Sequence, residues 1–242
     1  ILEIGTGHSP TASIAFWLLG FKEVYTIDTD RHLDKECFFL LLKWIYDNEE
    51  DIYKIEGISK KRVDLLLSLY LGPFEEILQN LEKNGFLYMA PLFLRNANFK
   101  SRYFDFIYSY DVLEHVPNSG IIEIFEISKI ILSESGFMIH RINYADHFAK
   151  NDPNISKINF LRFNKIIYKI LAGNKFMYMN RLRDCQFVKI FDDMKLDIIQ
   201  KKSDIDLKIK KQILKKSIKV HSDFNGINIK SLSTLSSDFV LK

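Results

Sequence analysis

Hydrophobic positions along this 242-residue chain alternate between short apolar runs and longer segments with helical spacing. Runs of four to six apolar residues predict strands, and apolar positions repeated every three or four residues predict helices. The first half therefore predicts strands at residues 1–4, 24–27, 86–89 and 104–109, and helices at residues 11–19, 33–46, 63–71 and 74–81. Strand, helix and strand within the first 27 residues form a βαβ unit, which predicts a parallel sheet.

The second half continues the same alternation and then loosens. It predicts helices at residues 119–132 and 187–194, and strands at residues 137–141, 196–199 and 238–241. It also predicts that Gly136 interrupts the regular structure between the first of these helices and the following strand. Residues 146–185 read as an insertion over the C-terminal edge of the sheet, where open α/β sheets bind ligands. Residues 201–220 carry eight Lys against two Asp, which predicts the solvated face of a helix.

These elements predict an α/β fold with a Rossmann-like, doubly wound, mostly parallel sheet in a single domain over residues 1–242. A hydrophobic content of 47% supplies enough apolar material for one core, and a net charge of +3 is too small to argue for a nucleic-acid partner. The longest nearly apolar run, residues 37–42, is too short for a membrane span. Two isolated cysteines favour a reducing, cytoplasmic setting, and the absence of an initiator Met suggests a chain cropped at its N-terminus.

The turn after the first predicted strand, residues 5–10 (GTGHSP), is the first candidate for chemistry. A dinucleotide fingerprint would place a third glycine where Pro10 stands, and a phosphate loop would end in Gly-Lys-Ser or Gly-Lys-Thr. Glu3 precedes the turn, and a carboxylate there repels a pyrophosphate but suits a cation. Asp28 ends the second strand, where it can accept hydrogen bonds from ribose hydroxyls, with Asp30 as a competitor. The structural alternatives are that Glu3 pairs with a core lysine and that Asp28 caps a helix.

The sequence resembles the class I S-adenosylmethionine-dependent methyltransferases. The resemblance rests on residues 2–7 (LEIGTG), on Asp28, and most specifically on residues 104–116 (FDFIYSYDVLEHV). It implies S-adenosylmethionine as the cofactor, with Asp28 on its ribose and the backbone around Ser109 near its methionine part. The implied cofactor site consists of Glu3, Gly5, Thr6, Gly7, Asp28, Thr29, Ser109 and Tyr110.

Later segments resemble a bacterial branch of that family linked to surface-polysaccharide biosynthesis. They are residues 139–147 (IHRINYADH), 159–163 (NFLRF) and 173–183 (GNKFMYMNRLR). This resemblance implies O-methylation of a small molecule or of a sugar or glycan precursor. An RNA methyltransferase and a non-catalytic binding protein on the same fold are the alternatives, and the oligomeric state stays open.

Two histidines are candidates for the base that removes a proton from the acceptor. His115 follows the fourth strand, and His147 follows the fifth strand, with Asp146 beside it as a residue that could orient the imidazole. The alternatives are structural roles outside the reaction for His115 and a loop-anchoring hydrogen bond for His147. His140 is expected in the core, and His8 is expected to line the glycine turn.

A metal site made of Asp111, Glu114 and His115 is the weaker reading, although the pattern is similar to ubiquinone-pathway O-methyltransferases, some of which use a metal. On one helical turn Asp111 and Glu114 share a face and His115 points elsewhere, so we expect transfer without a metal.

Arginines of the insertion are candidates for acceptor binding. Arg162, Arg181 and Arg183, together with Tyr178, could bind a phosphorylated or acidic acceptor, because arginine offers a planar fork of donors. The alternative is ordinary surface charge.

Overall fold

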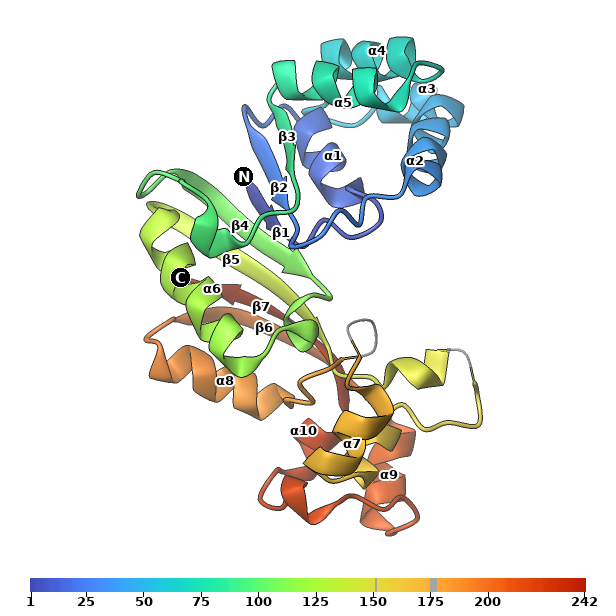
Figure 1. Cartoon of the computed structure of the whole chain (residues 1–242), viewed down its shortest axis with the longest axis vertical. Helices are drawn as coiled ribbons and strands as arrows, with labels where there is room; N and C mark the ends of the chain where they lie inside the picture. The colour runs from blue at the N-terminus through green and yellow to red at the C-terminus, as the bar shows by residue number, and fades with distance from the viewer. Residues whose placement is uncertain (151, 175–177) are drawn as a thin grey trace. The chain divides into compact units, whose positions relative to one another are not determined.

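The computed structural model describes residues 1–150, 152–174 and 178–242. The strand order is β3-β2-β1-β4-β5-β7-β6, and the first four of these strands are parallel wherever their register is defined. β7 runs antiparallel to both β5 and β6. The predicted α/β fold with a mostly parallel, Rossmann-like sheet and helices between the strands is confirmed (Figure 1).

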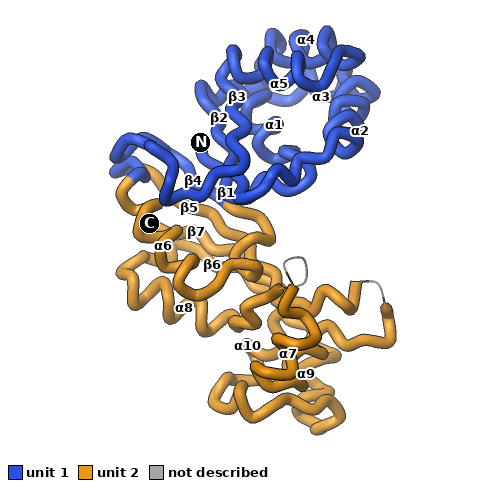
Figure 2. The backbone as a smooth tube through the Cα atoms, in the orientation of Figure 1, with its two compact units in different colours: residues 1–108, 131–135 blue, residues 109–130, 136–242 orange. Residues whose placement is uncertain are grey.

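The chain forms two compact units, each described separately below (Figure 2). Unit 1 comprises residues 1–108 and 131–135, and unit 2 comprises residues 109–130 and 136–242. The α-helices and strands within residues 1–110 are β1 (Leu2–Ile4), α1 (Thr11–Leu18), β2 (Val24–Ile27), α2 (Lys35–Asp47), α3 (Glu49–Ile52), α4 (Lys60–Leu69), α5 (Phe74–Lys83), β3 (Phe86–Met89) and β4 (Phe104–Tyr110). The remaining helices and strands are α6 (Asn118–Ile131), β5 (Leu132–Asn143), α7 (Lys165–Ala172), α8 (Asp184–Asp193), β6 (Ile198–Ile205), α9 (Leu207–Leu214), α10 (Ile229–Ser233) and β7 (Thr234–Leu241).

Helix α2 of unit 1 begins and packs as its sequence indicates. The Asp34 side chain caps α2 by accepting a hydrogen bond from the Cys37 N–H at 2.9 Å. The helix then buries Phe38, Leu42 and Ile45, which lie on one face because they are four and three residues apart. The break before α5 falls at Gly72 and Pro73, where it was predicted.

The insertion in unit 2 has a hydrophobic core of its own. The Asn164 side chain caps α7, and the helix buries Tyr168 and Ala172, one turn apart. These residues join a cluster that also contains Ile158, Phe160, Leu161, Ile209, Phe224, Leu232 and Leu235. Residues 146–185 therefore pack against the C-terminal segments that form α9 and α10. Residues 151 and 175–177 of the insertion lie outside the described residues.

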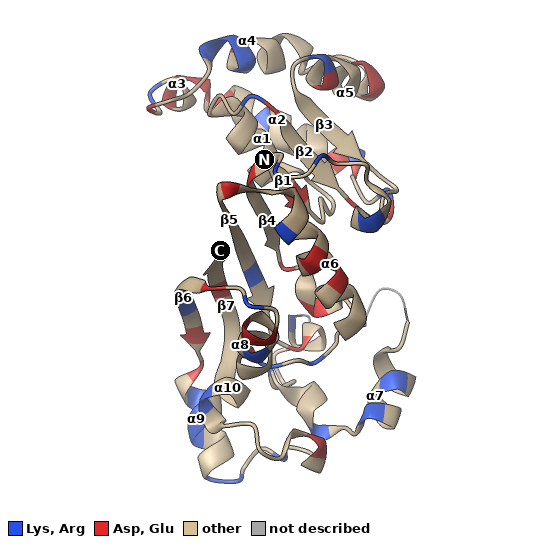
Figure 3. Ribbon diagram, turned by 90° about the vertical axis from the view of Figure 1, so that its left-hand side faces the viewer, with Lys and Arg blue, Asp and Glu red and all other residues tan. Residues whose placement is uncertain are grey.

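Two predicted boundaries are wrong. Gly136 does not interrupt the regular structure between the helix and the strand. β5 starts directly after α6 and continues through Gly136 to Asn143. Residues 201–205 belong to β6 rather than to a lysine-rich helix. They pair with β7 in the register Lys201↔Phe239, so cross-strand hydrogen bonding to β7 overrides the charge pattern. The helical lysines that remain are on α9, where Figure 3 shows them.

No helix in the described part of the chain is both long enough and apolar enough to cross a membrane.

Candidate active site

A row of polar side chains crosses the strands of unit 1 below the glycine turn. The parallel register aligns Thr26 of β2, Glu3 of β1 and Tyr108 of β4. Side chains in one such row share a face of the sheet. Ser13 of α1 and Thr26 donate to the same Glu3 carboxylate oxygen at 2.8 and 2.5 Å. The Tyr108 hydroxyl bonds to Ser13 at 2.8 Å.

Glu3 is therefore a buried member of a hydrogen-bonded network, with only 5% of its surface exposed. Burial is the largest influence on its carboxyl group and raises the pKa above the ordinary value, while the hydroxyl donors act in the opposite direction. The Thr6 hydroxyl also forms a hydrogen bond with the Thr26 hydroxyl at 2.6 Å, so the Thr6 side chain is hydrogen-bonded within the protein.

The glycine turn and the end of β2 are joined directly. The Gly5 N–H donates to the Ile27 carbonyl at 2.8 Å, and the Gly7 N–H donates to the Asp28 carboxylate at 2.9 Å. Gly7 has a φ of +62°, a left-handed conformation that favours glycine. A Cβ atom at Gly7 would meet no other atom within 4 Å, so the space beside the turn is open. We call Gly5, Gly7 and Asp28 the glycine–aspartate turn.

The other predicted cofactor residues differ in exposure. In unit 1, Thr29 is exposed, as is His8, whose ring lies 6.1 Å from that of His32. In unit 2, Ser109 is buried and its hydroxyl bonds to His140 Nδ1 at 2.8 Å. Tyr110 is 61% exposed, with the Arg141 guanidinium 5.1 Å from its ring.

A second group of polar side chains lies entirely within unit 2. Glu114 and His115 are on the 3-10 turn Leu113–His115, and His147 begins the turn His147–Lys150. The rings of His115 and His147 are tilted at 54° with their centroids 4.9 Å apart. One ligand atom from each of the three residues lies within 4.8 Å of the others. We call Glu114, His115 and His147 the Glu–His–His cluster.

The cluster differs from the metal set that the sequence suggested. The third member is His147, from a segment 32 positions beyond His115, whereas Asp111 forms an ion pair with Arg141 at 3.4 Å. His147 lies outside the turn of Asp111, Glu114 and His115, and the fold brings it to them.

Burial sets the protonation of two cluster members. It raises the pKa of the Glu114 carboxyl to about 8 and, as the largest influence, lowers the pKa of the His147 imidazole to about 4. Glu114 is 2% exposed. At neutral pH these shifts favour a neutral carboxylic acid and a neutral imidazole.

Asp146 and the Tyr178 segment hold the cluster in position. Both carboxylate oxygens of Asp146 accept backbone N–H groups, from Phe148 at 2.9 Å and Phe160 at 2.8 Å. Asp146 thus anchors the loop that carries His147. The His115 Nδ1 atom lies 2.8 Å from the Tyr178 carbonyl, to which only a protonated Nδ1 can donate.

Asn180 is a positioning residue that sequence reasoning missed. Its side-chain amide donates to the carbonyls of Leu113 at 2.7 Å and Val116 at 2.9 Å, and its N–H donates to the Glu114 carbonyl at 2.8 Å. The turn that carries Glu114 and His115 is therefore clamped by the insertion. A lone asparagine in a basic, aromatic stretch gave no sequence signal for this role.

The predicted acceptor-binding arginines occupy different environments. The Arg181 guanidinium donates to the carbonyls of Phe160 and Phe163 and lies 4.3 Å from the Tyr168 ring. Arg183 is fully buried and donates to the carbonyls of Tyr144, Ser231, Leu232 and Thr234. Arg162 is exposed and bonds to the Asn159 side chain at 3.3 Å. Of the three, Arg162 has the guanidinium most accessible to a ligand.

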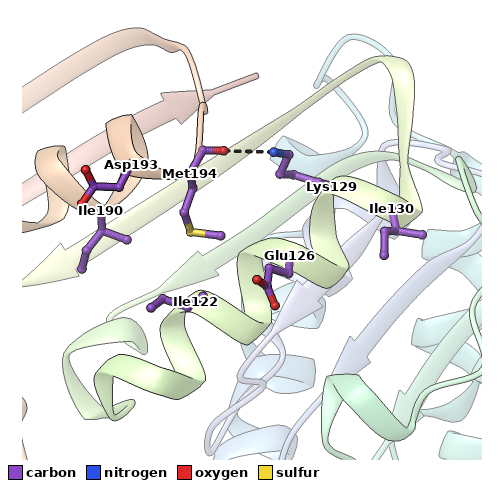
Figure 4. Close-up of a pocket in the computed structure, with 7 residues that line it drawn as sticks. All are labelled: Ile122, Glu126, Lys129, Ile130, Ile190, Asp193 and Met194. Atoms are coloured by element: carbon purple, nitrogen blue, oxygen red, sulfur yellow. Dashed lines mark hydrogen bonds between the residues drawn. The ribbon is translucent and has the colours of Figure 1, made fainter.

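A separate groove lies between α6 and α8, and it contains none of the residues discussed above (Figure 4). Across it, the Lys129 amino group donates to the Met194 carbonyl at 2.9 Å. The described residues that line it are Ile122, Glu126, Lys129, Ile130, Ile190, Asp193 and Met194.

Comparison with solved structures identifies the fold. An S-adenosylmethionine-dependent methyltransferase from Methanosarcina mazei superposes with a TM-score of 0.51 at 12% identity, over 99% of this chain and 90% of the other. The chain has the class I methyltransferase fold. Similar proteins from Mesorhizobium loti and Leishmania major have TM-scores of 0.48, at 11% and 9% identity. The matches cover 99% and 100% of this chain, with 88% of the Mesorhizobium protein and 63% of the Leishmania protein.

The sequence matches no protein-family model, and no curated protein matches it.

Proposed function

We propose that this chain is an S-adenosylmethionine-dependent methyltransferase. The observation that carries the proposal is the glycine–aspartate turn, in which the Gly7 N–H bonds to the Asp28 carboxylate beside open space. S-adenosylmethionine has no phosphate group, which agrees with a turn that lacks phosphate-loop residues and ends a strand containing the acidic Glu3.

The residues of the turn fit the cofactor in distinct ways. The second oxygen of the half-buried Asp28 carboxylate is 3.5 Å from the Asp30 N–H, a weak contact, so this oxygen can accept a ribose hydroxyl. Gly5 and Gly7 let the backbone approach the ligand, with Thr6 and Thr29 beside them. Glu3 supports the turn from below, because its carboxylate already accepts two hydroxyl groups. Ser109 and Tyr110 are proposed to contact the methionine part through their backbone.

We infer that the Glu–His–His cluster acts on the methyl acceptor. The bound cofactor supplies a methyl group already activated on a sulfonium, so the protein has to orient the acceptor and help remove its proton. The lone pair of the neutral His115 ring is on Nε2, because Nδ1 donates to the Tyr178 carbonyl, and burial keeps His147 neutral at pH 7. Either imidazole can take the proton, while Asp146 positions the loop of His147.

The proposed acceptor is a hydroxyl group of a small molecule or of a sugar precursor of a glycan. The resemblance of residues 139–147, 159–163 and 173–183 to polysaccharide-linked methyltransferases supports this choice. Arg162 is exposed and can pair with a phosphate or carboxylate of such an acceptor. Tyr178 and Arg181 are proposed to belong to the same surface, where Arg181 would act mainly by holding the backbone around Arg162, because it donates to the Phe160 and Phe163 carbonyls.

A methyl-transfer screen tests the proposal. The chain is incubated with S-adenosylmethionine labelled on its methyl group and with three panels: nucleotide-linked sugars, phenols, and structured RNA. We expect label in an oxygen-bearing small molecule or sugar. If only RNA were labelled, the acceptor would be RNA instead of a small molecule or sugar, and the proposed methyltransferase activity would still hold. Cofactor binding without transfer to any panel, even when the glycan panel is widened, would favour the non-catalytic alternative.

A further inference from the structure

Three side chains of the Glu–His–His cluster converge from two separate segments of unit 2. Glu114 is buried, and His115 and His147 are partly buried. Their ligand atoms lie within 4.8 Å of one another. Two imidazole nitrogens and one carboxylate oxygen form a donor set that catalytic zinc and other first-row transition metals use.

The cluster also contains poorly satisfied polar atoms. Within the described part of the chain, no hydrogen bond of normal geometry reaches either carboxylate oxygen of Glu114 or Nε2 of His147, although the N–H groups of Glu114 and Asn143 lie near enough to the Glu114 carboxyl group to lower its pKa. A buried polar group left unpaired is unfavourable, and most such groups in folded proteins find a partner. Lys150 contributes a nearby positive charge, but its side chain is exposed. The cluster therefore has the donor groups for a ligand from outside the chain.

The imidazoles are held by contacts that metal-binding histidines commonly make. His115 bonds through Nδ1 to the Tyr178 carbonyl, which leaves Nε2 as the lone-pair donor. A backbone carbonyl in this position fixes the tautomer and the ring orientation of a metal ligand. Asn180 clamps the turn of Glu114 and His115, and Asp146 fixes the loop of His147. Both segments are thus fixed independently of a ligand.

We propose that Glu114, His115 and His147 bind one divalent transition-metal ion, such as Zn²⁺. The ion binds the carboxylate form of Glu114, so binding releases the proton that the buried carboxyl group holds without metal. The two imidazoles favour such an ion over Mg²⁺, which prefers oxygen ligands. Ligand bonds of about 2.0–2.2 Å at tetrahedral angles place two donors about 3.3–3.6 Å apart. The ligand atoms, which lie within 4.8 Å of one another, would therefore close by up to about 1.5 Å through side-chain rotation when the ion binds.

The role of this ion rests on the proposed function. Three protein ligands leave at least one coordination position for an oxygen of the acceptor, as in catalytic zinc sites. An imidazole that donates its Nε2 lone pair to an ion cannot accept a proton there. In the metal-bound protein, the histidines would therefore act by holding the ion that orients the acceptor oxygen, rather than as direct proton acceptors.

Zinc binding to the whole chain tests the site without cofactor or acceptor. Chelator-treated protein is titrated with Zn²⁺ by calorimetry, and bound zinc is measured after dialysis. We expect one zinc per chain. Glu114→Gln and His147→Ala should each lower the affinity by at least about 10–100-fold. Cobalt in place of zinc should give the visible absorption of a low-coordinate site in the wild type and lose it in His147→Ala.

His221→Ala is the matched control, because His221 belongs to unit 2 and pairs with Asp223 at 3.0 Å, apart from the cluster. Circular dichroism checks that each variant is folded. Failure to bind one zinc, or unchanged affinity in both folded cluster variants, would overturn the metal site. S-adenosylmethionine affinity is measured on the same samples, and intact cofactor binding with no zinc would leave the proposed function standing.

Discussion

The two candidate regions differ in how their carboxyl groups are hydrogen-bonded. In unit 1, Glu3 accepts hydrogen bonds from Ser13 and Thr26, and the nearby Asp28 accepts the Gly7 N–H. In unit 2, no hydrogen bond of normal geometry reaches either oxygen of Glu114 from the described residues. The glycine–aspartate turn is thus a preformed, internally satisfied scaffold, whereas the Glu–His–His cluster is a set of donor atoms poised for a ligand. The contrast predicts that changes at the cluster impair turnover and that changes at the turn impair cofactor affinity.

The largest expected effect is on turnover. His115→Ala and His147→Ala should each lower the methyl-transfer rate by about 10²–10⁴-fold, the usual contribution of assistance to proton removal. The assistance comes from the imidazole itself or from the ion that the imidazoles hold on the acceptor oxygen. S-adenosylmethionine affinity should stay within about twofold of wild type. Single-turnover kinetics with saturating cofactor measures the rate. If both variants also lost cofactor affinity to a comparable degree, the assignment of turnover to the cluster and of cofactor binding to the glycine–aspartate turn would be wrong.

Asp28→Ala should weaken cofactor binding, because it removes the acceptor for a ribose hydroxyl and the partner of the Gly7 N–H. The loss should be about 1.5–3 kcal/mol, or about 10–150-fold in Kd. Calorimetry measures the affinity, and Asp28→Asn, which keeps one acceptor oxygen, should lose less. If Asp30→Ala shows the larger loss instead, the ribose partner is Asp30.

Arg181→Ala separates scaffolding from acceptor recognition within unit 2. Because Arg181 donates to the Phe160 and Phe163 carbonyls, its loss should lower the free energy of unfolding by about 1–2 kcal/mol. Arg162→Ala, at an exposed position, should change stability by less than about 0.5 kcal/mol. Urea denaturation compares the two variants. If both substitutions changed the free energy of unfolding by the same negligible amount, Arg181 would not be structural, and a direct role in binding the acceptor would be favoured.

The smallest effect is a pH dependence at Glu3. Burial raises its folded pKa above the unfolded value, so the folded state binds more protons between these two pKa values. Stability from this group is full below the unfolded pKa and is lost as pH rises through the folded pKa. Glu3→Gln should therefore remove a decline in stability that begins near pH 4.5, at most about 1.4 kcal/mol per pH unit. Thermal unfolding from pH 4 to 8 compares the variants. A wild-type stability that rises more steeply with pH than that of Glu3→Gln would contradict the assignment.

Sequence reasoning placed elements correctly where the signal lies in residues near each other in the chain. Residues 24–27 and 86–89 were placed correctly as strands, because their apolar runs are bounded by turn residues. Asp28 was expected at the end of the second strand, and its bond to the Gly7 N–H is a finding of the structure. The sequence placed His115 and His147 after successive strands at one edge of the sheet, but it could not give the contact between their rings or bring Glu114 to them. The same holds for Asn180, whose contacts to the turn at Glu114 span more than 60 residues.

Calorimetric titration of this chain with S-adenosylmethionine tests the central claim most directly. The account predicts saturable binding of one cofactor per chain, weakened by Asp28→Ala and unaffected by His221→Ala. S-adenosylhomocysteine, which keeps the ribose, should compete for the same site. A folded chain that binds neither compound, or a wild type and Asp28→Ala variant with equal affinity, would contradict the assignment of the glycine–aspartate turn as the cofactor site.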